Sequence, residues 1–448
     1  MNNNRHARIM WLTTLAVAIG LGCLLLAACG QSLSSPVPAP PASPPPEELP
    51  AEESDVVAEL SPTVAPVPSG GITLTWWTPE FFSPSAGDAS GEVLAQQIAG
   101  FVTMHPDIGV QPILKAAHGK GGILDFLRTA HAAAPSVLPD VITIDASDLP
   151  AAVQNGLLQP LDGLLSAELR DDLFPFALNV GQFDKQWYAV QFEADVQHLV
   201  YRTDKVQQPP STWDELLSGR GTYIFPAAGR EELLNDASLI QYLGAGGKFD
   251  ETTRQLSLAE QPLREMLTFY QQGAQRRRIP PQVLTFANVE ACWQAYLSGD
   301  AEMTNALASR YLAERDALRD SGFAALPTMD GQAVTISRGW ALAIVTTDAV
   351  HQAAAAEFVE WLLAPEHSAA WTQAAGWLPT RRSALDAWGA EDEYAAFLGT
   401  QLEAATFHPS GAGYVETARW LQQAVRDVLS GSASPEEAVE QALEASAP

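Results

Sequence analysis

The sequence predicts a two-lobed α/β protein, and three observations lead to that prediction. Short runs of aromatic and β-branched residues alternate with stretches that repeat apolar residues at helical spacing, which predicts a largely parallel sheet covered by helices on both faces. The chain has 448 residues, enough for two lobes that each bury a core. Finally, the extended segment 187–201 is interrupted by charge and followed by a loop and a new helix, as expected where a chain crosses between lobes.

The composition is strongly acidic, with 25 basic and 53 acidic side chains and a net charge of −28. A nucleic-acid partner is excluded because phosphate binding needs a basic face. The acidity favours solubility, and the alternative is steering of a cationic ligand. Of the three cysteines, Cys23 and Cys29 lie near the N-terminus and Cys292 stands alone, so we expect no intramolecular disulfide framework after processing.

The N-terminal residues 1–29 have the pattern of a secretory signal, with basic residues in the first eight positions and an apolar run over 9–26. A single membrane span is the alternative, since about 18 apolar residues nearly suffice to cross a bilayer. The ending Leu-Ala-Ala-Cys at 26–29 resembles the lipobox of bacterial lipoproteins, which implies that Cys29 is lipidated. Residues 30–71 are rich in Pro, Ser, Ala and Glu and predict a disordered tether.

The folded body then begins with alternating elements. Strands are predicted at 72–77, 109–114 and 139–144, the last ending at Asp145, and helices are predicted around 94–102 and 123–130 and before Asn155-Gly156. In the crossing segment, strands at 187–192 and 198–201 flank Glu193 and Asp195. Thr212 and Glu215 have capping-box spacing, so a helix should begin there.

The second half of the body continues in the same manner. Helices are predicted around 263–270, 289–297, 355–362 and 421–428 and from Pro435, and strands from 303 and at 323–328. The extended run 334–345, broken by Arg338-Gly339, is interpreted as a second crossing, and 374–381 as a third.

Several of these segments resemble one family. Tyr-Ala-Val-Gln-Phe-Glu-Ala at 188–194, followed by Leu-Val-Tyr-Arg-Thr-Asp-Lys and Pro-Pro-Ser-Thr-Trp-Asp-Glu-Leu, resembles the first crossing of the family 1 extracellular solute-binding proteins, which include the maltodextrin-binding proteins. Further segments match in the family's order, including Gly-Trp-Ala-Leu-Ala-Ile at 339–344 and Gly-Trp-Leu-Pro-Thr-Arg at 376–381. The resemblance covers nearly all of 72–382.

The resemblance implies a type 2 periplasmic-binding-protein-like fold with about three interlobe crossings and a ligand cleft between the lobes. We expect an N-terminal lobe of 72–193 and 338–376 and a C-terminal lobe of 194–337 and 377–448. The implied function is a lipid-anchored, extracytoplasmic receptor of an ABC importer that captures a carbohydrate for membrane permease subunits. It would be monomeric and non-catalytic, with no cofactor or metal. The alternatives are a receptor for a polyol or amino compound, a surface carbohydrate-processing enzyme, or a structural lipoprotein of the cell envelope.

A sugar offers an apolar face and a rim of hydroxyls, which receptors meet with aromatic and polar side chains. Ligand-binding candidates are therefore aromatic residues at strand ends and crossings together with nearby polar residues: Trp77, Glu80, Asp145, Glu193, Asn305, Arg338, Trp340 and Trp377. Glu193 and Asn305 are assigned by the resemblance. Each has a structural alternative: a core position for a tryptophan, a hinge carboxylate for Glu193 and an interlobe ion pair for Arg338.

Other chemistries find little support. The eight histidines show no paired metal-ligand spacing, and the glycine-rich segments fit neither a phosphate loop nor a dinucleotide fingerprint. No Gly-x-Ser-x-Gly nucleophile motif occurs. Paired carboxylates for glycoside hydrolysis stay open, because their separation is a three-dimensional quantity.

Overall fold

The computed structural model describes residues 71–229, 234–389, 392–411 and 413–446. The predicted signal, the predicted lipidation site Cys29 and nearly all of the predicted tether lie outside these residues. Within the described ranges, no helix combines the length and apolar character needed to cross a membrane.

The first sheet has five strands in the order β2-β1-β3-β12-β6. Its strands are β1 (Ile72–Thr78), β2 (Ile108–Leu114), β3 (Val141–Asp145), β6 (Val190–Gln191) and β12 (Trp340–Ile344). β1 runs parallel to both β2 and β3, as predicted. β12 is antiparallel to β3 and to β6, so the expectation of a largely parallel sheet is wrong for this edge. β12 arrives from the second sheet rather than over a covering helix, which explains its reversed direction.

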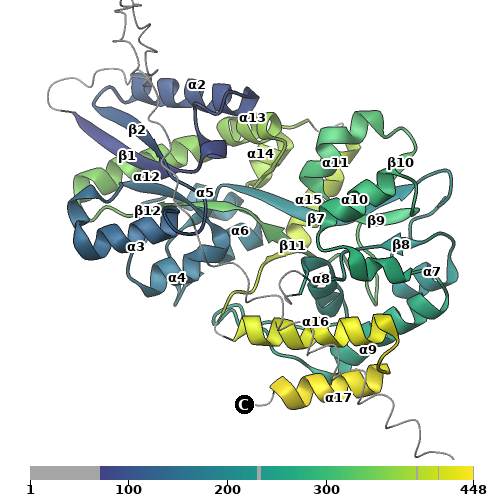
Figure 1. The fold of residues 1–448 in the computed structure, drawn as a ribbon. Helices are drawn as coiled ribbons and strands as arrows, with labels where there is room; N and C mark the ends of the chain where they lie inside the picture. The colour runs from purple at the N-terminus through teal and green to yellow at the C-terminus, as the bar shows by residue number, and fades with distance from the viewer. Residues whose placement is uncertain (1–70, 230–233, 390–391, 412, 447–448) are drawn as a thin grey trace, which may run out of the picture. The chain divides into compact units, whose positions relative to one another are not determined.

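Helices cover both faces of this sheet. They are α2 (Ala89–Met104), α3 (Ile123–Ala133), α4 (Leu149–Gln154), α5 (Ala167–Asp172), α6 (Pro175–Asn179), α12 (Ala349–Leu363) and α13 (Pro365–Ala375). Figure 1 shows α2 above the sheet and α3 and α4 below it. Because neighbouring strand residues point to opposite faces, the Trp76 ring packs against Phe358 of α12 and the Trp77 ring against Phe126 of α3.

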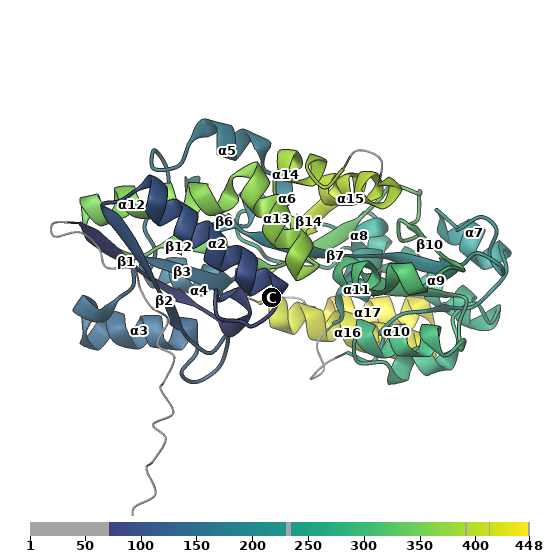
Figure 2. The same ribbon diagram turned by 90° about the horizontal axis from the view of Figure 1, so that it is seen from above.

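The second sheet has the order β14-β11-β7-β9-β8, and β10 and β13 also pair with β7. Its strands are β7 (Glu193–Arg202), β8 (Tyr223–Ile224), β9 (Met303–Leu307), β10 (Ser321–Ala324), β11 (Thr335–Arg338), β13 (Leu378–Pro379) and β14 (Ala405–Phe407). β7 is ten residues long and pairs with β9, β10, β11 and β13 along its length. Figures 1 and 2 show it running from the first sheet into the second.

Helices also pack around the second sheet. They are α7 (Trp213–Ser218), α8 (Asp236–Gly244), α9 (Glu260–Gln275), α10 (Val289–Leu297), α11 (Ala308–Glu314), α14 (Arg382–Asp386), α15 (Glu393–Ala404), α16 (Tyr414–Ser430) and α17 (Pro435–Ser446). The predicted capping box at Thr212 and Glu215 is present at the start of α7. The strand predicted at 323–328 instead lies at 321–324, and the one predicted at 187–192 is divided between β5 (Gln186–Trp187) and β6.

Two connections between the sheets are short. β6 in the first sheet leads to β7 in the second with only Phe192 between them, and β11 leads back to β12 through Gly339. A Cβ atom at Gly339 would lie 2.2 Å from the Glu193 carbonyl oxygen, so only glycine lets the two connections pass this closely. The lobe boundaries expected at 193/194 and 337/338 fall beside these connections, and the one expected at 376/377 falls between α13 and β13. The division into lobes stays a prediction.

Candidate functional site

A group of aromatic rings lies where the first sheet meets the second, a region that we call the junction. The short helix η1 (Glu80–Phe82) follows β1 and carries Phe81, whose ring centroid lies 5.2 Å from that of Trp340 and 6.3 Å from that of Trp377. The Phe81 and Trp377 rings are nearly parallel, with an interplanar angle of 21°. Phe81 is 42% exposed, whereas Trp340 is only 6% exposed. We call Phe81, Trp340 and Trp377 the aromatic group.

The topology of the first sheet explains this position. The parallel strands β1, β2 and β3 end at the same edge, and ligands in open α/β sheets collect outside the carboxyl ends of strands. β12 brings Trp340 to this edge opposite Asp145, the last residue of β3. His118, in the loop after β2, lies 5.3 Å from the Trp340 ring, and its Nε2 is 3.6 Å from Asp145 Oδ2.

Glu193, the first residue of β7, lies beneath this edge and is fully buried. Its Oε1 accepts a 2.7 Å hydrogen bond from the backbone N–H of Trp340, so it joins the two short connections. Its Oε2 has no hydrogen-bond partner among the described residues. Burial raises the pKa of Glu193 well above its ordinary value, and the negative charges of Asp195 and Asp145 raise it further.

Asp195, two residues along β7, is a second carboxyl at the junction. Its oxygens accept hydrogen bonds from the backbone N–H groups of Val196 and Ser309 and from the Ser309 hydroxyl. Burial raises the pKa of Asp195 to about 6, although these hydrogen bonds oppose the rise.

Arg338 ends β11 and forms a forked pair with Asp236 at the start of α8. Arg338 Nε donates to Asp236 Oδ2 at 2.8 Å and Nη2 donates to Oδ1 at 2.6 Å. His408 Nε2 lies 3.4 Å from the same Oδ1 and 2.9 Å from the Tyr414 hydroxyl. Burial would raise the pKa of Asp236, but the charge and hydrogen bonds of Arg338 lower it strongly. The sequence left open an interlobe ion pair for Arg338, but the pair lies on the second-sheet side, because β11 belongs to the second sheet and α8 packs against β11.

The structure brings five of the eight predicted site residues to this junction and leaves two away from it. Trp340, Trp377, Glu193, Asp145 and Arg338 belong to the two connections and the edge described above. Glu80 is exposed beside Phe81.

Trp77 and Asn305 lie inside the two lobes. Trp77 is 4% exposed under α3, with the Lys115 Nζ 4.6 Å from its ring, because it points to the face of β1 away from α12. Asn305 is fully buried in β9, where it donates to Gln197 Oε1 and accepts from the Tyr223 hydroxyl. Both ends of its amide are thus occupied within the second sheet.

Sequence reasoning missed Phe81, His118 and Asp236. A signal was available for the first two, because each follows the end of a predicted strand at the sheet edge where ligands collect. No local signal marks Asp236, whose role depends on Arg338, 102 positions along the chain.

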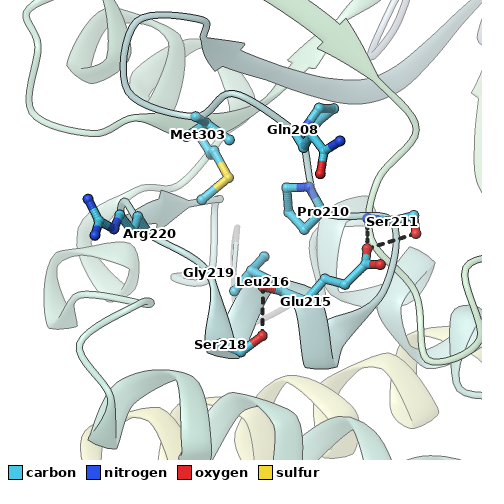
Figure 3. A pocket seen from close by; sticks show the side chains of 11 residues that line it. Gln208, Pro210, Ser211, Glu215, Leu216, Ser218, Gly219, Arg220 and Met303 are labelled. Carbon is cyan, nitrogen blue, oxygen red and sulfur yellow. Dashed lines mark hydrogen bonds between the residues drawn. The ribbon is translucent and has the colours of Figure 1, made fainter.

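A well-defined pocket elsewhere in the molecule does not coincide with this site. It measures about 520 Å³ and lies between the loop after β7, α7 and Met303 of β9. Figure 3 shows Glu215 in this pocket turned toward Ser211, whose backbone N–H and hydroxyl donate to the Glu215 carboxylate. No aromatic side chain lines the pocket. A smaller pocket of about 230 Å³ adjoins the junction and is lined by His118, Asp125, Arg128 and Asp148.

The junction combines exposed aromatic faces with hydrogen-bonding groups, which suits a polar solute that has an apolar face. Among the residues that the structure describes, no group of three or more histidine, cysteine, aspartate or glutamate side chains is arranged to hold a metal ion.

Comparisons with known proteins identify the family of this chain. Residues 98–396 match the family described as bacterial extracellular solute-binding protein. The maltotriose-binding protein of Pyrococcus abyssi (strain GE5 / Orsay) is 31% identical over 71 residues, and the match spans about a sixth of each chain, 16%.

Among solved structures, the cyclic alpha-maltosyl-1,6-maltose binding protein from Arthrobacter globiformis is similar with a TM-score of 0.68 at 19% identity, over 84% of this chain and 98% of that one. The sugar-binding protein MalE from the phytopathogen Xanthomonas citri is similar with a TM-score of 0.65 at 22% identity, over 83% and 96%. The two-lobed α/β fold predicted from the sequence is thereby confirmed. Because the family model matches well over half of the chain, this protein belongs to the bacterial extracellular solute-binding proteins.

Proposed function

We propose that this protein captures a carbohydrate at the junction between its two sheets. The observation that carries the proposal is the aromatic group, in which the rings of Phe81 and Trp377 are nearly parallel and Trp340 pairs with Asp145 across the sheet, two positions after Arg338. Aromatic faces suit the C–H face of a sugar, and the polar groups suit its hydroxyls. The similarity to a maltotriose-binding protein and to a cyclic alpha-maltosyl-1,6-maltose binding protein supports the same class of ligand.

The proposed ligand contacts are Trp340, Trp377, Glu193, Asp145 and Arg338, with Glu80 and Phe81 at the rim. The proposed lobes are 72–193 with 338–376 and 194–337 with 377–448. Ligand would stabilise one arrangement of the lobes by making contacts that the other arrangement lacks.

The proposed role is that of an extracytoplasmic receptor of an ABC importer that hands its ligand to membrane permease subunits. The family name supports the extracytoplasmic location, and the family is one of binding proteins rather than enzymes. The resemblance of residues 26–29 to a lipobox supports anchoring through acyl chains on Cys29.

A second candidate ligand is an amino compound. It is favoured by the carboxyls at the junction, since Asp145 and Asp195 have no arginine or lysine ion-pair partner among the described residues, whereas Arg338 is engaged by Asp236. A cationic nitrogen would be attracted to such a site.

Thermal unfolding of the full-length chain with maltose, maltotriose, maltotetraose, a polyol and a set of amino compounds tests these candidates. A ligand at a hundred times its dissociation constant stabilises the folded state by about 2.7 kcal/mol. Stabilisation by the sugars supports carbohydrate capture, and stabilisation by amino compounds alone replaces it with the second candidate. Release of smaller sugars from the oligosaccharides would contradict the prediction that the protein is not an enzyme.

The anchor is tested by replacing Cys29 with serine and separating membranes from the soluble fraction. We expect the Cys29→Ser protein to leave the membrane fraction. Retention in membranes would contradict lipidation and favour an uncleaved span.

A further inference from the structure

Arg254 is a buried arginine that reaches from one half of the molecule into the other. It lies in the loop between α8 and α9, beside the second sheet, and is 2% exposed. Its Nη2 donates to the carbonyl oxygens of Val180 at 2.6 Å, Gln182 at 3.1 Å and Asn179 at 3.4 Å. These carbonyls belong to the end of α6 and the start of β4 (Gln182–Phe183), which precede β6 of the first sheet.

Aromatic rings from both halves enclose its guanidinium group. The guanidinium carbon lies 3.9 Å from the ring centroid of Phe183 in β4 and 4.8 Å from that of Phe407 in β14. β14 is an edge strand of the second sheet. Arginine is suited to such a position because its planar cation stacks on aromatic faces and is more weakly hydrated than an ammonium group.

Arg254 has no carboxylate partner within 4 Å among the described residues. Its Nε and Nη1 atoms are buried without a hydrogen-bond acceptor, and desolvation lowers its pKa to about 10. The side chain therefore stays charged at neutral pH while making only three contacts to carbonyl groups. A buried charge without an ionic partner costs free energy, so packing alone does not account for an arginine at this position.

The backbone around Arg254 holds it in an unusual conformation. Arg254 has a φ of 59°, in the left-handed region that is strained for a side chain of this size. Asp250 accepts hydrogen bonds from the N–H groups of Thr252 and Thr253, which closes the loop. Gly411 donates to the Arg254 carbonyl at 2.9 Å, and a Cβ atom at Gly411 would lie 2.3 Å from the Thr253 carbonyl oxygen.

Beside Arg254, α6 also packs against β14 and α15, and the hydrogen bonds of the loop itself to the hairpin are few. A pocket of about 350 Å³ opens between the loop at Glu251 and Thr252 and the hairpin at Gln182–Lys185. Asn179 Nδ2 and Glu251 Oε2 are 3.3 Å apart at its border. The link between loop and hairpin is therefore concentrated in the Arg254 side chain.

We propose that Arg254 is a positioning residue that latches the loop before α9 to the α6–β4 segment and thereby fixes the angle between the two lobes. The latch lies outside the candidate ligand site, so it acts on capture only through the lobe arrangement. Its role in ligand capture rests on the proposed receptor function, whereas its effect on the lobe arrangement is measured without any ligand.

The test measures lobe–lobe distances by spin labels in the full-length protein. The labels are attached through unnatural amino acids at Met104 on α2 and Val415 on α16, which are 68% and 46% exposed. Arg254→Met keeps the length and apolar contacts of the side chain but removes the charge and the three hydrogen bonds. We expect a broader and displaced distance distribution for Arg254→Met, with Arg254→Lys closer to the parent.

Arg264→Met is the matched control, because Arg264 pairs with Glu260 within α9 and bridges nothing else. It should leave the distribution unchanged. If Arg254→Met fails to fold, Phe183→Leu removes only the ring from the α6–β4 side and should broaden the distribution in the same direction. A distance distribution in Arg254→Met that equals the parent's would overturn the proposed latch. If Arg254→Met does not fold, the same result in Phe183→Leu would overturn it. Failure of the parent protein to bind any sugar would overturn the proposed function and leave the distance result standing.

Discussion

The two sides of the junction present different kinds of side chain. The first-sheet side presents aromatic rings, in which Phe81 and Trp377 are partly exposed and Trp340 is buried beneath them. The second-sheet side presents charge, with Asp236 held by Arg338 and His408. Burial would make the carboxyls of Asp236 and Glu193 neutral, yet only Glu193 has a raised pKa, because only Asp236 has a cationic partner. A partner, rather than depth, decides whether a junction carboxyl is charged.

The largest expected effect concerns the buried member of the aromatic group. Trp340→Ala removes a ring that packs against Phe81, Phe82 and His118. We expect it to lower the free energy of unfolding by about 3–5 kcal/mol, measured by denaturant titration. Phe81→Ala, at a 42% exposed position, should cost only about 1 kcal/mol. Equal losses would show that the two rings do not differ in structural role.

The next effect concerns the charged side. Arg338→Met leaves Asp236 without its main partner, and we expect a loss of about 2–3 kcal/mol at neutral pH. The pKa of Asp236 is lowered in the folded state, so its stabilisation is present above the ordinary aspartate pKa of about 4 and is lost as pH falls further. The difference between parent and variant should therefore shrink below about pH 4. A difference that stays constant with pH would contradict this account.

Ligand binding sharpens the comparison further. If the aromatic group contacts a sugar, Phe81→Ala or Trp377→Ala should weaken maltotriose binding about tenfold, or about 1.4 kcal/mol, in calorimetric titration. The control is Trp420→Ala, since Trp420 is similarly exposed at 40% but lies on α16. An equal loss of affinity in Trp420→Ala would show that the effect comes from a change in folding rather than from a lost ligand contact.

The smallest effect is a change in pH dependence. Glu193 and Asp195 have raised pKa values in the folded state, so they stabilise most below the unfolded-state values of about 4 and lose that contribution as pH rises through the folded-state values. Glu193→Gln mimics the protonated carboxyl and keeps an acceptor for the Trp340 N–H. The fall in unfolding free energy between pH 4 and neutral pH should become shallower.

The control for this change is Glu302→Gln. Burial would raise the pKa of Glu302, but hydrogen bonds from Thr222 lower it, so its removal should alter the slope with the opposite sign. A slope that is the same in parent and Glu193→Gln would mean that Glu193 is charged in the folded protein.

Much of the architecture could be predicted from local sequence. The helix at 289–297 and the capping box at Thr212 agree with the structure, because apolar spacing and capping act within a few residues of each other. The break at Arg338-Gly339 was also visible, since glycine interrupts an otherwise apolar extended run. The break expected at Glu193–Asp195 was misplaced, because β7 runs through both carboxyls and the chain leaves the first sheet at Phe192. The sequence thus determined most of the elements and which family the chain resembles.

Only the tertiary structure decided which side chains meet. Trp76 and Trp77 are adjacent, yet the direction of each was fixed by the helices that pack on β1. Asp236 finds Arg338 across 102 positions, and Arg254 reaches Val180 across 74. Such contacts depend on how the two sheets are joined, and pairing over these separations leaves no periodic signal in the sequence. The fold could therefore be predicted from local patterns, whereas the charge state and exposure of the candidate-site residues depend on tertiary packing.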